Sequence, residues 1–188
     1  LEVIAPAREW GMNRIEEKEY AVKMGIPVQE EKGHMYSIDE NLWGRSIEGE
    51  DLEDPWSEPT EAPYAWTKPI DLTPEAPQYV EISFTEGVPA AIDGKAMSLI
   101  DIINYLNVVA GEHGVGRIDH VENRLVGIKS REIYEAPAAV VLNIAHQALE
   151  ALVLSKEQLR FKEYSSQIYA DLIYNGLWFT GMREDLYA

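Results

Sequence analysis

The sequence predicts an α+β fold in which an antiparallel sheet packs against helices, and three observations support this class. Apolar and polar residues alternate across residues 79–92 around a Thr-Glu-Gly turn, which is typical of an antiparallel hairpin. Apolar residues at helical spacing follow in residues 99–111 and again from Pro137 onward. Between these helices, residues 118–128 hold short runs of β-compatible apolar residues, which predict two further strands.

Composition places the chain among soluble globular proteins. Its 188 residues are 46% hydrophobic and 26% charged, which is enough material for a sizeable core. The formal net charge of -17 argues against a nucleic-acid or anionic-membrane surface, because such surfaces need clustered Lys and Arg. With no long apolar run and no signal-peptide pattern, a cytoplasmic protein is expected. The absence of cysteine excludes disulfides and thiolate metal sites.

The first residues predict a strand followed by a helix. Residues 1–5 form a compact apolar run, which is typical of a buried strand. Asn13 with Glu16 predicts a capping box at the start of a helix, and Gly25 predicts its end. Because strand, loop and helix in this order form part of an α/β unit, we expect residues 1–30 to be the tail of a larger upstream domain.

Residues 31–188 are predicted to form a second domain that begins with a long loop. Six prolines and a run of acidic residues disfavour a packed element in the stretch up to Pro77. Within this stretch, Ser37 and Glu40 predict the cap of a short helical turn. Three tryptophans are expected to anchor the loop by burying their rings: Trp43, Trp56 and Trp66.

Capping residues predict the helices of this domain. Ser98 begins a helix that Gly111 is expected to close. Pro137 fits the first position of the next helix. Ser155 and Gln158 form a capping box for a third helix.

The end of the chain predicts one more helix. Thr180 is expected to cap a helix that begins at Met182 and that the sequence stops too early to complete. An apolar cluster, residues 177–179, comes directly before it. An unfinished helix beside an apolar cluster is typical of an interface.

The stretch 113–137 carries an unusual density of charged residues between short apolar runs. Gly114 and Gly116 allow a tight turn at its start. The polar triplet Glu122-Asn123-Arg124 is predicted to be a turn or bulge between two strands. It would present an anion, an amide and a cation together, which suits a zwitterionic ligand. A surface hairpin with solvated charges is the alternative, and spacing alone favours that alternative.

The common catalytic signatures are absent from the sequence, which has no Cys nucleophile, no G-x-S-x-G and no G-x-x-x-x-G-K-[ST]. The four histidines form no i, i+4 ligand pair, so no metal site is predicted. Asp119 with Glu122, and Glu132 with Glu135, could act as acid and base, but this spacing is common among solvated charges. Chemistry alone therefore predicts no more than a ligand-binding α+β domain.

Seven segments along the chain carry a resemblance to one family. They are IAPAREW at 4–10, GIPV at 25–28, YSIDENLWGRS at 36–46, LEDPW at 52–56, GVGRID at 114–119, VENRLVGIKSREIYE at 121–135 and YNGLWF at 174–179. With these motifs, the sequence resembles argininosuccinate synthases of the bacterial type. The motifs are long and ordered, which makes them far more specific than a short pattern.

The resemblance implies an enzyme that joins citrulline to aspartate with ATP, through a citrulline adenylate, and releases pyrophosphate and AMP. It also implies a homotetramer whose subunits combine an ATP-pyrophosphatase-like nucleotide domain with a synthetase domain. ATP and magnesium would be bound by the full-length enzyme, and no cofactor or metal contact is carried over to this chain. The citrulline contacts that are carried over are Ser37, Ser46, Glu122 and Tyr134.

Parts of the family's pattern have no counterpart in this sequence: the Ser-Gly-Gly phosphate loop, the aspartate-binding segment, the remaining citrulline contacts and the C-terminal extension. The chain is therefore expected to be the synthetase domain, preceded by the last strand and helix of the nucleotide domain, and to be inactive alone. The alternative is a purely structural oligomerisation domain, which the helices from Pro137 onward and the cluster 177–179 indicate.

Overall fold

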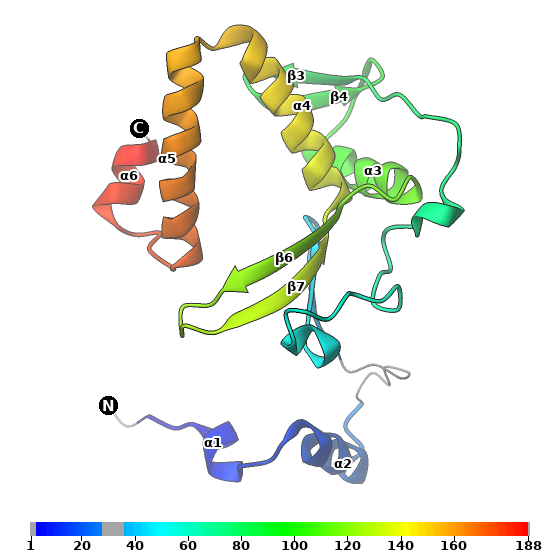
Figure 1. The fold of residues 1–188 in the computed structure, drawn as a ribbon, viewed down its shortest axis with the longest axis vertical. Helices are drawn as coiled ribbons and strands as arrows, with labels where there is room; N and C mark the ends of the chain where they lie inside the picture. The colour runs from blue at the N-terminus through cyan, green and yellow to red at the C-terminus, as the bar shows by residue number, and fades with distance from the viewer. Residues whose placement is uncertain (1–2, 28–35, 188) are drawn as a thin grey trace. The chain divides into compact units, whose positions relative to one another are not determined.

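The computed structural model describes residues 3–27 and 36–187 (Figure 1). The described residues form six α-helices and two antiparallel sheets, which confirms the predicted α+β class. The chain divides into two compact units, Leu1–Met35 and Tyr36–Ala188, which are described one at a time.

The first unit contains helices α1 (Pro6–Trp10) and α2 (Arg14–Met24). The predicted capping box is confirmed, because the Asn13 side chain accepts from the backbone N–H of Glu16 at 3.1 Å while Glu16 accepts from that of Asn13 at 2.8 Å. The predicted strand over residues 1–5 is wrong for residues 3–5, which have no regular structure, and residues 1 and 2 lie outside the described residues. Pro6 begins a helix instead, since proline fits the first helical turn.

The second unit is organised around a four-stranded sheet in the order β1-β2-β7-β6. Its strands are β1 (Ser37–Glu40), β2 (Arg45–Glu48), β6 (Arg117–Asn123) and β7 (Lys129–Glu135). All neighbouring strands are antiparallel. One face covers a small core of Tyr36, Ile47, Leu52 and Ile133.

Two predictions for residues 37–66 are wrong. Ser37 begins a strand rather than capping a helical turn, because Asn41 closes a tight hairpin in which its side chain accepts from the backbone N–H of Trp43 at 2.8 Å. The tryptophans were predicted to bury their rings, but Trp56 is 92% exposed and Trp43 is also exposed, whereas Trp66 is half-buried. The short 3-10 helices Glu50–Glu53 and Ile70–Leu72 interrupt this otherwise loop-rich stretch.

The turn between β6 and β7 lies further along the chain than predicted. Glu122 and Asn123 are paired within β6, and the chain reverses across residues 124–128. The backbone N–H of Arg124 donates to the carbonyl of Ile128 at 3.0 Å, and Gly127 supplies the left-handed φ of 84°. The polar triplet was therefore wrongly predicted as the turn, because the glycine that permits it comes three residues after the triplet.

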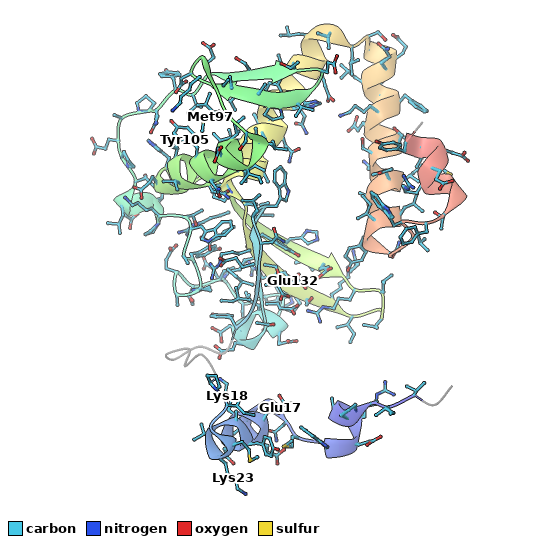
Figure 2. All side chains as sticks on the ribbon, turned by 180° about the vertical axis from the view of Figure 1, so that it is seen from behind. Glu17, Lys18, Lys23, Met97, Tyr105 and Glu132 are labelled. Carbon is cyan, nitrogen blue, oxygen red and sulfur yellow. The ribbon has the colours of Figure 1, made fainter. Side chains whose placement is uncertain are left out.

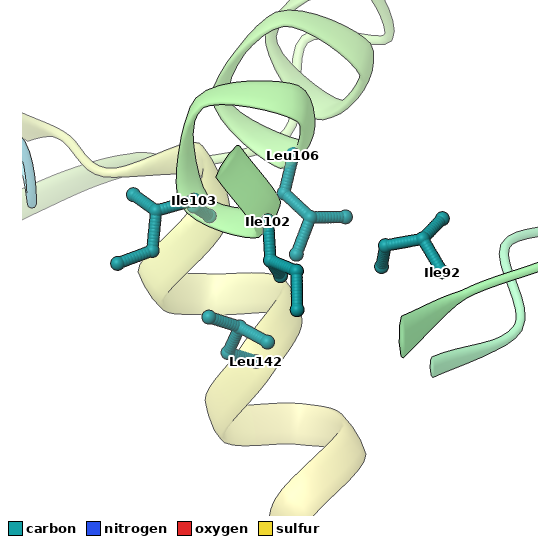
Figure 3. Packing of buried hydrophobic residues seen from close by; sticks show 6 residues of the cluster. Ile92, Ile102, Ile103, Leu106 and Leu142 are labelled. Carbon is teal, nitrogen blue, oxygen red and sulfur yellow. The ribbon is translucent and has the colours of Figure 1, made fainter. Parts of the chain in front are cut away.

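A second sheet has the order β3-β4-β5, with β3 (Ile82–Thr85), β4 (Val88–Ile92) and β5 (Lys95–Ala96), which confirms the predicted hairpin. It packs beside helices α3 (Leu99–Glu112) and α4 (Pro137–Val153). The larger core lies between them and consists of Ile92, Ile102, Ile103, Leu106, Ala138 and Leu142 (Figure 3). Met97 and Tyr105 pack against it and are labelled in Figure 2.

The helix caps follow the sequence closely, with one exception. Ser98 caps α3 by accepting from Asp101, and Pro137 begins α4, as predicted. Gly111 does not close α3, which continues to Glu112; a Cβ on Gly111 would lie 2.1 Å from the Trp66 carbonyl oxygen. Glycine is therefore needed here for close backbone approach.

The chain continues into α5 (Lys156–Tyr174) and α6 (Gly181–Tyr187), and α6 lies beside α5 in Figure 1. The predicted capping box of Ser155 and Gln158 is confirmed. Thr180 donates to the Leu177 carbonyl at 2.8 Å, and α6 begins one residue earlier than predicted. Among the described helices, none combines the length and apolar character that a membrane-spanning segment needs.

Candidate functional site

One face of the four-stranded sheet carries all four predicted site residues. Ser46 is paired with Tyr134 across β2 and β7, and Glu122 is paired with Ser130 across β6 and β7. Side chains alternate between faces along a strand, and directly paired residues share a face. Ser37 lies two residues before Asp39, the partner of Ser46, and so belongs to the same face.

The four residues do not share one row of this face: Ser46 lies in the row of Tyr134, whereas Glu122 lies in the row of Ser130. Tyr134 and Ser130 are four residues apart on β7, so the row of Glu122 lies about 13 Å from the row of Tyr134. Glu132, labelled in Figure 2, occupies the row between them. It is paired with His120 on β6. A buried carboxylate therefore stands at the middle of the face.

Glu132 is held by three neighbours on the same face. The Tyr134 hydroxyl donates to its Oε2 at 2.6 Å, the Ser130 hydroxyl lies 3.3 Å from its Oε1, and Arg124 approaches Oε1 to 3.1 Å. Arg124 also forms an ion pair with Glu48 on β2. Arg124 and Glu132 thereby connect side chains of β2, of β7 and of the turn after β6.

The electrostatics of this network keep Glu132 ionised and Tyr134 protonated. Burial raises the pKa of Glu132, but hydrogen bonds with Glu122, Tyr134 and Arg124 outweigh burial and lower the pKa to about 2. Burial and the hydrogen bond to Glu132 both raise the pKa of Tyr134 well above its usual range. At neutral pH the Tyr134 phenol therefore keeps its proton and directs it to Glu132.

Glu122 lies at an open cavity of about 750 Å³ next to this network. The cavity is lined by β6, by Arg124 and Leu125 of the following turn, by Tyr134, and by Asp171, Tyr174 and Asn175 at and just after the end of α5. The Tyr174 hydroxyl of α5 donates to Oε1 of Glu122. Ser37 and Ser46 are on β1 and β2, on the far side of β7, so they extend the polar face beyond the cavity.

The opposite face of β7 holds a structural carboxylate. Glu135 is fully buried and accepts hydrogen bonds from the backbone N–H groups of residues 65–67 at 2.8–2.9 Å and from Arg45. Burial raises the pKa of Glu135, but these hydrogen bonds lower it overall. Because residues three apart on a strand face opposite ways, Glu132 and Glu135 cannot act as an acid and base pair, and neither can Asp119 and Glu122 on β6.

Sequence reasoning did not place two residues, Glu132 and Tyr174, beside the predicted citrulline contacts. Glu132 could have been found from strand alternation, which places it on the face of Ser130 and Tyr134. Tyr174 gave no local signal, because it meets Glu122 from 52 residues away. Within the described ranges, no group of three or more His, Asp or Glu residues is placed to hold a metal ion.

Comparison with known proteins shows which family the sequence matches. Residues 36–188 match the family described as "Arginosuccinate synthase C-terminal domain". Over all 188 residues, the chain is 61% identical to an argininosuccinate synthase of Dehalococcoides mccartyi, of which it covers 46%. It is 56% identical to the enzyme of that name from Dictyoglomus turgidum and 57% identical to the one from Bacillus pumilus, covering 47% of each. The chain thus spans less than half the length of these curated relatives.

Proposed function

The chain belongs to the argininosuccinate synthase family, and on that premise we propose that it supplies the citrulline-binding part of an enzyme that joins citrulline to aspartate. In the full-length enzyme, ATP would activate citrulline as an adenylate, with release of pyrophosphate and AMP. The observation that supports this role is the placement of Ser37, Ser46, Glu122 and Tyr134 on one face of one sheet. The proposal includes a cytoplasmic homotetramer, and it assigns ATP and magnesium to the full-length enzyme rather than to residues of this chain.

The chemistry of the face suits an amino acid with a long polar side chain. An ionised Glu122 only accepts hydrogen bonds, so it matches an α-ammonium group. The hydroxyls of Ser37 and Ser46 can both donate and accept, so they suit the polar groups at either end of citrulline. Holding the neutral ureido group in place for attack on ATP can contribute about 7 to 11 kcal/mol to lowering the barrier.

Calorimetric titration of the chain with citrulline tests this proposal. We expect saturable binding that Glu122→Ala strongly weakens, because the variant removes the anion that would receive the ammonium group. Glu163→Ala is the matched control, since it removes an exposed carboxylate from α5 and should leave binding unchanged. Equal citrulline affinity in the wild type and in Glu122→Ala would contradict the assignment.

A structural role in subunit association is the second candidate, and exposed apolar side chains support it. Large apolar residues at the end of α4, on α5 and after it are exposed, among them Leu152, Val153, Phe161 and Phe179. Sedimentation equilibrium would detect a mass that rises with concentration and that Phe161→Glu lowers. A concentration-dependent mass without citrulline binding would favour this role alone.

A further inference from the structure

The last turn of α5 holds Tyr174 in a fixed place. The backbone N–H of Gly176 donates to the carbonyl of Ile173 at 3.0 Å, and that of Leu177 donates to the carbonyl of Leu172 at 2.8 Å. Gly176 has a φ of 69°, the left-handed conformation that a helix end closed by these two hydrogen bonds requires. These bonds enclose Tyr174 and so fix its backbone at the end of the helix.

The Tyr174 hydroxyl connects the helix to the strand that carries Glu122. It donates to Oε1 of Glu122 and lies 3.4 Å from the backbone carbonyl oxygen of Asn123. A phenol carries a single proton, so this bond commits it to the carboxylate. The hydrogen bond to Glu122, together with burial, raises the pKa of Tyr174, which keeps the donor protonated at neutral pH.

We infer that Tyr174 is a positioning residue that holds the Glu122 carboxylate in the orientation in which it receives the α-ammonium group of the amino-acid substrate. Glu122 lines the open cavity and its Oε1 is bonded to Tyr174, so this hydrogen bond restricts how the carboxylate can face a ligand in that cavity. A half-exposed glutamate side chain samples several rotamers, and ordering it at each binding event costs entropy. Tyr174 orders the side chain before the ligand arrives. Because Tyr174 acts through Glu122, its role rests on the proposed function.

The test is the steady-state kinetics of a full-length synthase that carries this sequence. Tyr174→Phe keeps the half-exposed ring and removes only the hydroxyl, so the melting temperature should stay unchanged. We expect the KM for citrulline to rise about fivefold to tenfold with kcat close to the wild-type value, because an interaction that orders the binding site is lost. Tyr164→Phe is the matched control, since that phenol is exposed on the same helix.

A double variant tests whether Tyr174 acts through Glu122. When Glu122 is already Ala, Tyr174→Phe should raise the KM no further, because the group that it orders is gone. An additional rise in that background, an unchanged KM in Tyr174→Phe, or an equal rise in Tyr164→Phe would overturn the inference. If Glu122→Ala itself leaves the citrulline KM unchanged, the proposed function fails. If Glu122→Ala raises the KM while Tyr174→Phe does not, the positioning role alone fails.

Discussion

Arg45 and Glu135 form an ion pair between neighbouring strands β2 and β7 in the interior of the second unit. They are direct partners across the two strands, and both side chains are buried. The same carboxylate accepts hydrogen bonds from the backbone N–H groups of residues 65–67. One buried anion thus joins two strands of the sheet to a loop with no regular structure of its own.

Replacing Glu135 with Ala is expected to lower the free energy of unfolding by about 3 to 5 kcal/mol. The change takes away the buried partner of Arg45, which keeps its ion pair with the exposed Glu40 at 2.8 Å, and it removes the acceptor of three backbone N–H groups. Urea denaturation measures the loss, and Glu75→Ala, at an exposed position, should stay within about 0.5 kcal/mol of the wild type. A loss below about 1 kcal/mol in Glu135→Ala would show that the buried pair is not a main support of the fold.

Gly111→Ala is expected to destabilise the protein although Gly111 lies within a helix. Alanine normally stabilises a helix interior by about 1 kcal/mol relative to glycine, but here its Cβ would lie 2.1 Å from the Trp66 carbonyl oxygen. The loop or the helix must move, which typically costs about 1 to 3 kcal/mol. Gly181→Ala is the control, because a Cβ at that position would meet no other part of the protein within 4 Å. The melting temperature of this variant should not fall. Equal melting temperatures for the two variants would refute the steric reason.

The helices were predictable because their signals are local. The caps at Asn13, Ser98 and Ser155 each depend on residues three apart, and all three are confirmed. Ser37 and Glu40 have the same spacing, yet they lie in a strand, since pairing with β2 outweighs the local preference. The turn after β6 was misplaced because a polar triplet attracted the prediction away from Gly127.

The site was less accessible to sequence reasoning than the helices. Resemblance to a family selected Ser37, Ser46, Glu122 and Tyr134, whereas spacing alone favoured a solvated hairpin. The shared face of these residues depends on strand register, which joins β2 to β7 across about 90 residues and leaves no local trace in the sequence. The same holds for Tyr174, whose contact with Glu122 needs the full length of α4 and α5.

Acid should reduce stability partly through Glu132. The folded protein holds the pKa of Glu132 at about 2, below its ordinary value of 4.5, so this carboxylate stabilises the fold above about pH 4.5 and loses that contribution as the pH falls towards 2. Glu132→Gln has no proton to gain, so its stability should fall less than that of the wild type between pH 4.5 and 2. Urea denaturation across this range measures both slopes. Glu163→Gln should keep the wild-type slope, and a similar slope in Glu132→Gln would contradict the expectation.

Ser46 offers a separate test of the polar face. Its direct partner across the strands, Tyr134, already donates its hydroxyl proton to Glu132. The Ser46 hydroxyl is thus a donor that the ligand can use in that row. Ser46→Ala should raise the citrulline KM of a full-length synthase about twofold to tenfold, the effect of losing one neutral hydrogen bond. Ser83→Ala removes an exposed hydroxyl from the other sheet and should leave the KM unchanged. An unchanged KM in Ser46→Ala would confine the binding site to β6, β7 and the end of α5, where the cavity lies.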